Sequence, residues 1–266
     1  MYFYELVIAV VLISIYYVYV VTRLYKFKSS QPDFSSAINF MLLTLTSCFI
    51  GMWCLISFLS NGNYAAIAFM VLFGFFGTCF SIVAIYKASY NFFTVYKYIG
   101  NEKTAHTLLW GYVPFTVMPG LIALVNFITG FGFALFGFFL WNFISDTIME
   151  VLFYIKLRSL KYRIGSDIEA SMVALKALQK MFIYKSLVVA LAILTISGFF
   201  TLFSLYGDVE VGLYLFIYSI MILIPTSAIL FQQRLYCTSL IPKVSLGESD
   251  LHEIVKSTDQ VTFVVH

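Results

Sequence analysis

Long runs of apolar residues, separated by short polar segments, dominate the pattern along this chain. A helix needs about 20 mostly apolar residues to cross the hydrocarbon of a bilayer. Seven runs reach or approach this length, at residues 6–22, 37–60, 64–86, 107–129, 131–155, 186–206 and 211–231. The pattern therefore predicts an all-α membrane protein, with a seven-transmembrane helix bundle over residues 1–240 and a disordered cytoplasmic tail over residues 241–266.

The positions of the basic residues predict how these spans are oriented, because Lys and Arg accumulate on the cytoplasmic side of a membrane. All 16 Lys and Arg lie in segments on one side, namely 23–36, 87–106, 156–185 and 232–266. The segments on the other side hold none of them, namely 1–5, 61–63, 130 and 207–210. The basic flank of the first run follows it, which is unlike a cleavable signal peptide. We therefore expect the N-terminus outside and the C-terminus in the cytoplasm.

An eighth span over residues 88–99 is the alternative count. This stretch is too short to cross the hydrocarbon, and it contains Lys97. A cytoplasmic extension of the third helix, or an interfacial segment, agrees better with its length and charge.

Composition supports a membrane protein and excludes several other classes. Hydrophobic residues make up 61% of the chain and charged residues 11%, against about 45–50% and about 25% in soluble domains. No basic arm of the kind that binds nucleic acid is present. The four cysteines show no metal-ligand spacing, and we expect no metal and no cofactor. The bilayer is the expected partner, of either the plasma membrane or an endomembrane, and an oligomer is compatible with the sequence.

The third cytoplasmic loop has the most organised sequence outside the spans. Its first half is a basic continuation of helix five and carries Lys156, Arg158, Lys161 and Arg163. Gly165 interrupts this helix, and Ser166 with Glu169 forms a capping box, so helix six should begin near Asp167. Either the loop binds anionic lipid through its basic residues, or it is a docking surface for a cytosolic partner.

A second cytoplasmic feature follows the last span. Cys237 lies among apolar residues just inside the predicted membrane boundary, which makes it a candidate site for S-palmitoylation. The alternative is an unmodified thiol.

Helix five carries the most informative polar pattern. Asn142, Asp146, Glu150 and Tyr154 recur every four residues and therefore share one helix face; we call them the helix-five stripe. A carboxylate inside the membrane is costly unless it is paired, protonated or hydrated, so the stripe should face the bundle interior or a water-filled cavity. It is either a ligand, ion or proton site, or a pair of structural carboxyls satisfied by neighbouring helices. The spans contain no Lys or Arg, so neutral partners are expected for Asp146.

Signatures of enzymes are missing from the chain. It contains no His-Glu-x-x-His, no Gly-x-Ser-x-Gly and no phosphate-binding Gly-x-x-x-x-Gly-Lys-Ser/Thr. An intramembrane aspartyl protease would need two Asp in facing helices, whereas only Asp146 lies within a span. We therefore do not expect an enzyme.

The topology resembles that of G-protein-coupled receptors: seven helices, an outer N-terminus, a basic third cytoplasmic loop, and a proline, Pro225, in helix seven. The resemblance covers roughly residues 1–240 and is one of topology. Rhodopsin-like receptors carry Asp-Arg-Tyr after helix three, where this chain has Ala84-Ile85-Tyr86-Lys87, and Asn-Pro-x-x-Tyr in helix seven, where it has Ile224-Pro225-Thr226-Ser227-Ala228. The chain is thus more similar to divergent receptors of fungi, protists or nematodes.

Two other seven-helix families agree less well with the sequence. Microbial rhodopsins hold retinal on a lysine of helix seven, and residues 211–231 contain no lysine. Seven-helix sugar transporters carry prolines in their early helices, and the first three spans contain none.

Three functional hypotheses remain open. The first is a receptor-like signalling protein for a small or lipid-like ligand, coupled through the third cytoplasmic loop to a G protein or another cytosolic partner. The second is a transporter or channel that uses Asp146 and Glu150 as an ion or proton site. The third is a membrane scaffold without a ligand.

Overall fold

The computed structural model describes two continuous parts of the chain, residues 2–99 and 209–239, together with shorter pieces between them. These pieces are residues 107, 110, 111, 118, 120–122, 125, 141, 144, 147, 148, 151, 152, 154, 155, 173, 176, 177, 179–186, 190 and 193. At residues 2–6, 59, 92–99 and 209–220 the description covers the backbone alone. Within these residues the fold is helical and contains no strand.

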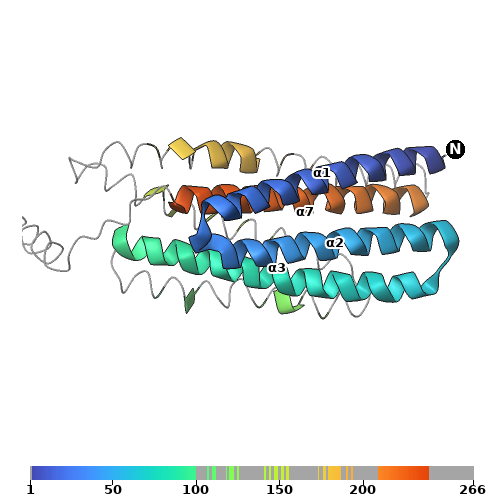
Figure 1. The fold of residues 1–266 in the computed structure, drawn as a ribbon, viewed down its shortest axis with the longest axis horizontal. Helices are drawn as coiled ribbons and strands as arrows, with labels where there is room; N and C mark the ends of the chain where they lie inside the picture. Colours follow the sequence, from blue (N-terminus) through green and yellow to red (C-terminus); the bar gives the residue numbers. More distant parts are fainter. Residues whose placement is uncertain are drawn as a thin grey trace, which may run out of the picture.

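Four long helices are aligned side by side in one bundle (Figure 1). They are α1 (Tyr2–Ser30), α2 (Ser35–Asn61), α3 (Tyr64–Ile99) and α7 (Val209–Ser239). A 3-10 turn, η1 (Pro32–Phe34), joins α1 to α2. Three stretches are long and apolar enough to cross a membrane: Val7–Ser30, Pro32–Phe58 and Tyr64–Asn91. They coincide with the first three predicted spans, and α7 contains the seventh, at residues 211–231.

The directions of these helices limit the number of further crossings. The N-terminus lies at one end of the bundle, and α1, α3 and α7 all run away from that end, whereas α2 returns to it (Figure 1). The chain between the end of α3 and the start of α7 must therefore pass from one end of the bundle to the other. An odd number of crossings is needed, and the three spans predicted between residues 107 and 206 meet this condition.

The segment that was the candidate eighth span is part of α3. Residues 88–99 continue this helix without a break to Ile99. With 36 residues, α3 is about 54 Å long at 1.5 Å per residue, which exceeds the hydrocarbon thickness of about 30 Å. The preferred interpretation, an extension of the third helix, is confirmed.

The core lies where α1, α2 and α7 meet, and its residues follow a seven-residue repeat. On each helix the buried apolar positions are spaced alternately by four and three residues, as in helices that pack at a small crossing angle. They are Ile13, Tyr17, Val20, Leu24 and Phe27 on α1, Phe34, Ile38, Met41 and Leu45 around the start of α2, and Ile224, Ala228, Phe231 and Leu235 on α7. The outer face of α1 exposes large apolar side chains instead, among them Ile8, Leu12, Ile15 and Val18. A bilayer would cover this face.

Small residues allow α2 and α3 to approach each other closely. A Cβ atom built on Gly77 of α3 would lie 3.2 Å from Cys48 Sγ and 3.5 Å from Ser47 Cβ of α2. The neighbouring buried hydroxyls are satisfied within their own helices, since Thr44 donates to the Phe40 carbonyl at 2.9 Å and Thr78 to the Gly74 carbonyl at 2.9 Å. Close approach through small residues is how membrane helices gain van der Waals contact without a hydrophobic driving force.

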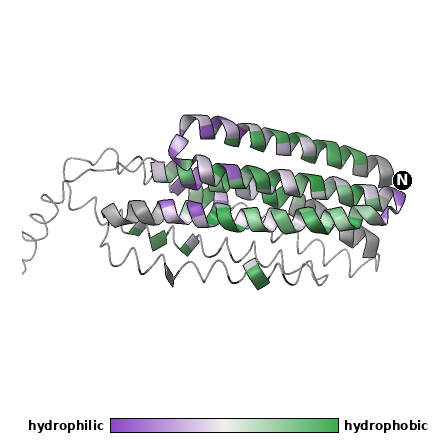
Figure 2. Ribbon diagram, turned by 60° about the horizontal axis from the view of Figure 1, so that its bottom comes forward, coloured by the Kyte–Doolittle hydropathy of each residue, from purple (hydrophilic) through white to green (hydrophobic). Residues whose placement is uncertain are grey.

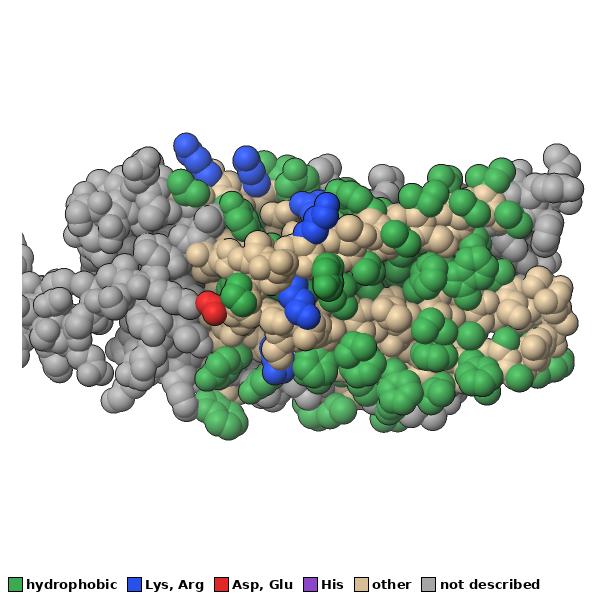
Figure 3. Space-filling view, in the orientation of Figure 1, with side chains coloured by type: hydrophobic (Ala, Val, Ile, Leu, Met, Phe, Trp, Pro, Cys, Tyr) green, Lys and Arg blue, Asp and Glu red, His purple; other side chains and the backbone are tan. Residues whose placement is uncertain are grey.

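Polar and charged residues are concentrated at the ends of the bundle. Hydrophobic residues occupy most of the helix length, and hydrophilic ones gather towards the two ends (Figure 2). On the face in Figure 3, the Lys and Arg side chains all lie in the half away from the N-terminus. The short turn at the other end is closed by Gly62, whose φ of 62° places it in the left-handed region where glycine is favoured. This distribution agrees with the predicted orientation.

We expect Gly77→Leu to separate α2 from α3, because the added side chain would overlap Cys48 and Ser47. Overpacking of this kind costs about 1–3 kcal/mol, so the melting temperature of the purified protein should fall by several degrees. Gly111→Leu is the matched control, because a Cβ at Gly111 meets nothing within 4 Å. Equal melting temperatures for the two variants would contradict the close α2–α3 contact.

Candidate functional site

The structure describes one member of the helix-five stripe, Tyr154. Asn142, Asp146 and Glu150 lie outside the described residues. The basic residues predicted to form the coupling surface also lie outside them, namely Lys156, Arg158, Lys161 and Arg163. The side chains described around the stripe nevertheless show which way this part of the chain faces.

The described residues between 141 and 155 share one exposed face. Their exposed side chains are Trp141, Ile144, Ile148, Val151, Leu152 and Ile155. At about 100° per residue, these positions cluster around one direction, and the four positions of the stripe fall on the opposite side of the helix. Tyr154 is half-buried, as that direction requires. The geometry therefore supports the prediction that the stripe faces the bundle interior.

Tyr154 contacts the helical run at residues 179–186, which precedes the sixth predicted span. Gln179 Nε2 donates a hydrogen bond to the Tyr154 hydroxyl at 3.4 Å. The rings of Tyr154 and Phe182 meet edge to face, with centroids 6.2 Å apart. Residues 173, 176 and 177 are helical as well, so this helix is formed before residue 186, as the capping box predicted.

Lys185 lies beside the stripe, and the sequence gave no sign of this. We assigned Lys185 to the cytoplasmic loop, but its side chain is only 5% exposed. Its ammonium donates to Thr147 Oγ1 at 3.4 Å, and Thr147 directly follows Asp146. Lys176 and Lys180, on the same segment, are exposed. The expectation that no cation lies near the stripe is therefore wrong, because hydropathy along the chain does not report which face of a helix a lysine occupies.

A second buried cation connects α3 with α7. Arg234 is 4% exposed, and its guanidinium donates to Ser89 Oγ at 3.4 Å. Ser89 is itself buried and donates to the Ile85 carbonyl at 2.7 Å. The sequence placed Arg234 in the cytoplasmic segment after the last span, whereas α7 continues to Ser239. Both helix ends, at the predicted cytoplasmic side, thus meet through a polar contact.

Cys237 belongs to the same extension of α7. Its side chain is 3% exposed. An acyl transferase needs access to the thiol, so S-palmitoylation at Cys237 would require α7 to rotate or to unwind at its end.

Polar contacts also join α1 to α7 next to a proline. The hydroxyls of Tyr16 and Thr226 lie 3.0 Å apart, and the Tyr17 hydroxyl contacts Met221 Sδ at 3.9 Å. Pro225 lies inside α7 and has no N–H, so it removes one hydrogen bond from the helix. The two tyrosines hold α1 against the weakest point of the α7 backbone.

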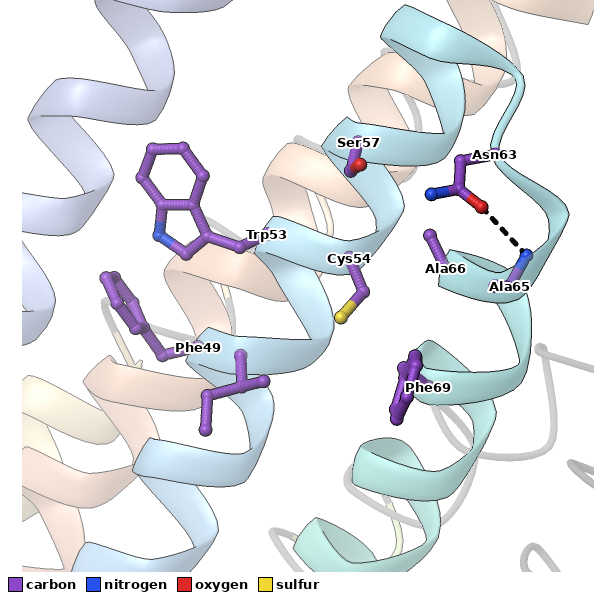
Figure 4. Close-up of a pocket in the computed structure, with 9 residues that line it drawn as sticks. Phe49, Trp53, Cys54, Ser57, Asn63, Ala65, Ala66 and Phe69 are labelled. Carbon is purple, nitrogen blue, oxygen red and sulfur yellow. Dashed lines mark hydrogen bonds between the residues drawn. The ribbon is translucent and has the colours of Figure 1, made fainter.

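A groove of about 500 Å³ lies between α2 and α3 near the turn at Gly62. Cys54 and Phe69 lie between the two helices, while Phe49 and Trp53 extend on the other side of α2 (Figure 4). Its walls are mostly apolar and aromatic, and the groove is open rather than enclosed. Its shape and lining suit an apolar ligand better than an ion.

No protein-family model matches the chain, and neither a curated protein nor a solved structure matches it. Function therefore has to be argued from the residues themselves.

We expect Arg234→Gln to destabilise the protein more than Arg23→Gln. Arg234 is buried between two helices, whereas the contact of Arg23 with the Tyr19 hydroxyl, at 3.4 Å, is exposed. Loss of a buried charged hydrogen bond costs about 1.5–3 kcal/mol, which lowers the melting temperature by several degrees. Thermal unfolding of both variants checks this, and equal shifts would argue against a structural role for Arg234.

Proposed function

We propose that this chain is a receptor-like seven-transmembrane signalling protein. It responds to a small or lipid-like ligand and passes the response to a cytosolic partner, a G protein or another protein, through the third cytoplasmic loop. The proposal rests on one observation in particular: the two segments that flank this loop meet through polar contacts, at Tyr154–Gln179 and Thr147–Lys185.

These polar contacts differ in kind from the packing of α1, α2 and α7. The latter three helices share one cluster of buried apolar side chains, and interdigitated packing of this kind resists sliding. Hydrogen bonds with donor–acceptor distances of 3.4 Å are long, and water or a binding partner can replace them at the predicted cytoplasmic end. The contrast supports a rigid set of helices beside a pair that can move, which is what a receptor needs.

The position of the ligand follows from the length of the outer segments. The predicted outer loops are too short to form an extracellular domain, so a ligand has to enter between the helices or through the bilayer. The groove beside Trp53 and Phe69 can be reached by a molecule that partitions into lipid. The face opposite the exposed residues of helix five, with Asp146 on it, is the polar alternative.

We expect Lys161→Gln together with Arg163→Gln to weaken recruitment of the cytosolic partner by about tenfold, the effect of about 1.4 kcal/mol. The physical reason is the loss of two charges from the coupling surface. Proximity labelling in intact cells, quantified by mass spectrometry, measures the recruited proteins. Deleting residues 165–178 should remove the same proteins.

Lys26→Gln together with Lys28→Gln is the matched control. It removes the same charge from the cytoplasmic side, but from the end of α1, which is packed against the apolar core. If the loop variants recruit the same proteins as the control, the proposal of a receptor coupled through this loop fails.

A further inference from the structure

The contacts between the fifth and sixth predicted spans define how the two helices are aligned. Tyr154 meets Gln179, and Thr147 meets Lys185. Seven residues backwards along one helix thus correspond to six residues forwards along the other, so the helices are antiparallel. Lys185 lies opposite Thr147, at a level between positions 146 and 150 of the stripe.

Helix geometry decides which of these two positions faces Lys185. Thr147 and Tyr154 both point towards the sixth-span segment. At about 100° per residue, position 150 lies about 60° from the direction of Thr147 and about 40° from that of Tyr154. Position 146 lies about 100° and about 80° from them. Position 150 is therefore the closer one in direction.

The tilt of helical side chains favours the same position. Side chains in an α-helix lean towards the N-terminus of their own helix. The sixth-span segment starts at the predicted cytoplasmic side, so Lys185 leans towards that side and towards the level of position 150. A side chain at position 150 leans the other way, towards Lys185. The two side chains converge across a separation of about three residues, or about 4.5 Å along the axis.

We propose that Lys185 is the internal counter-charge of the helix-five stripe, and that its partner is Glu150. A lysine and a glutamate near hydrocarbon stabilise each other when they pair, because each alone would be a costly buried charge. The burial of Lys185 against Thr147, while Lys176 and Lys180 on the same segment are exposed, is the observation that carries this pairing.

The pairing deepens the proposed function and rests on it for its role. The pair joins the helices on either side of the third cytoplasmic loop, so it holds them together when no ligand is bound. Separation of the two side chains releases the loop for its partner.

The first experiment measures melting temperatures of the full-length protein in lipid nanodiscs, followed by fluorescence of its three tryptophans. Lys185→Met and Glu150→Gln should each lower the melting temperature by about 5 °C. The double variant should melt close to the less stable single variant, because the second change removes a charge that is already unpaired. Lys180→Met is the matched control and should melt like the unmodified chain.

Asp146→Asn combined with Lys185→Met tests the choice of partner. The effects of these two changes should add, because Asp146 faces away from Lys185. Additive effects with Glu150, or coupling with Asp146 instead, would overturn the assignment. Where a single variant fails to fold, the exchange Glu150→Lys with Lys185→Glu should recover folded protein; no recovery also overturns it.

A second experiment tests the role of the pair and is independent of the first. The double variant Lys185→Met, Glu150→Gln should raise recruitment of the cytosolic partner without added ligand by at least about fivefold. Unchanged recruitment would refute the latch, even if the melting temperatures show the pair. Recruitment that does not depend on residues 165–178 would refute the proposed function and leave the pair intact.

Discussion

Hydrocarbon offers no hydrogen-bond partners, so every polar group of this chain within the bilayer has to be satisfied by the protein. Two solutions occur in the described helices. The hydroxyls of Thr44 and Thr78 donate to backbone carbonyls of their own helices, and such a helix remains free to pack by shape alone. Tyr16 and Thr226, in contrast, satisfy each other across two helices. A contact of the second kind fixes which helices are neighbours and at what level.

The two kinds of contact are distributed unevenly over the bundle. Apolar side chains at seven-residue spacing join α1, α2 and α7, and small residues bring α2 and α3 together. Buried charged groups join the remaining pairs that are described, Arg234 with Ser89 and Lys185 with Thr147. Because a polar contact is either made or broken, it provides two discrete arrangements, whereas close packing provides one. This difference favours a switching protein over a static scaffold.

The same constraint explains how far the sequence predicts the structure. Span positions depend on length and mean hydropathy, so the first three spans, the turn at residues 61–63 and the extension of α3 were all predictable. The inward direction of the stripe followed from its four-residue spacing, and the half-buried Tyr154 agrees with it. Lys185 and Arg234 were misplaced because the partner of each lies far along the chain, and a count of charges between spans averages over all faces of a helix. Their burial depends on tertiary packing that no local pattern encodes.

A single lysine cannot neutralise two carboxylates, and this imbalance bears on the role of Asp146. If Glu150 pairs with Lys185, Asp146 remains one helical turn further from the predicted cytoplasmic side. Asn142, one turn further again, can donate a hydrogen bond to one carboxylate oxygen, but it cannot neutralise the charge. Asp146 then has to hold a proton or bind a cationic group that enters from outside the chain. A receptor and a transporter would use this residue differently, since only the transporter must also release what Asp146 binds on the other side of the membrane. The latch at Glu150 favours the receptor, because it couples the occupancy of the stripe to the cytoplasmic ends of two helices without requiring a path between the two sides.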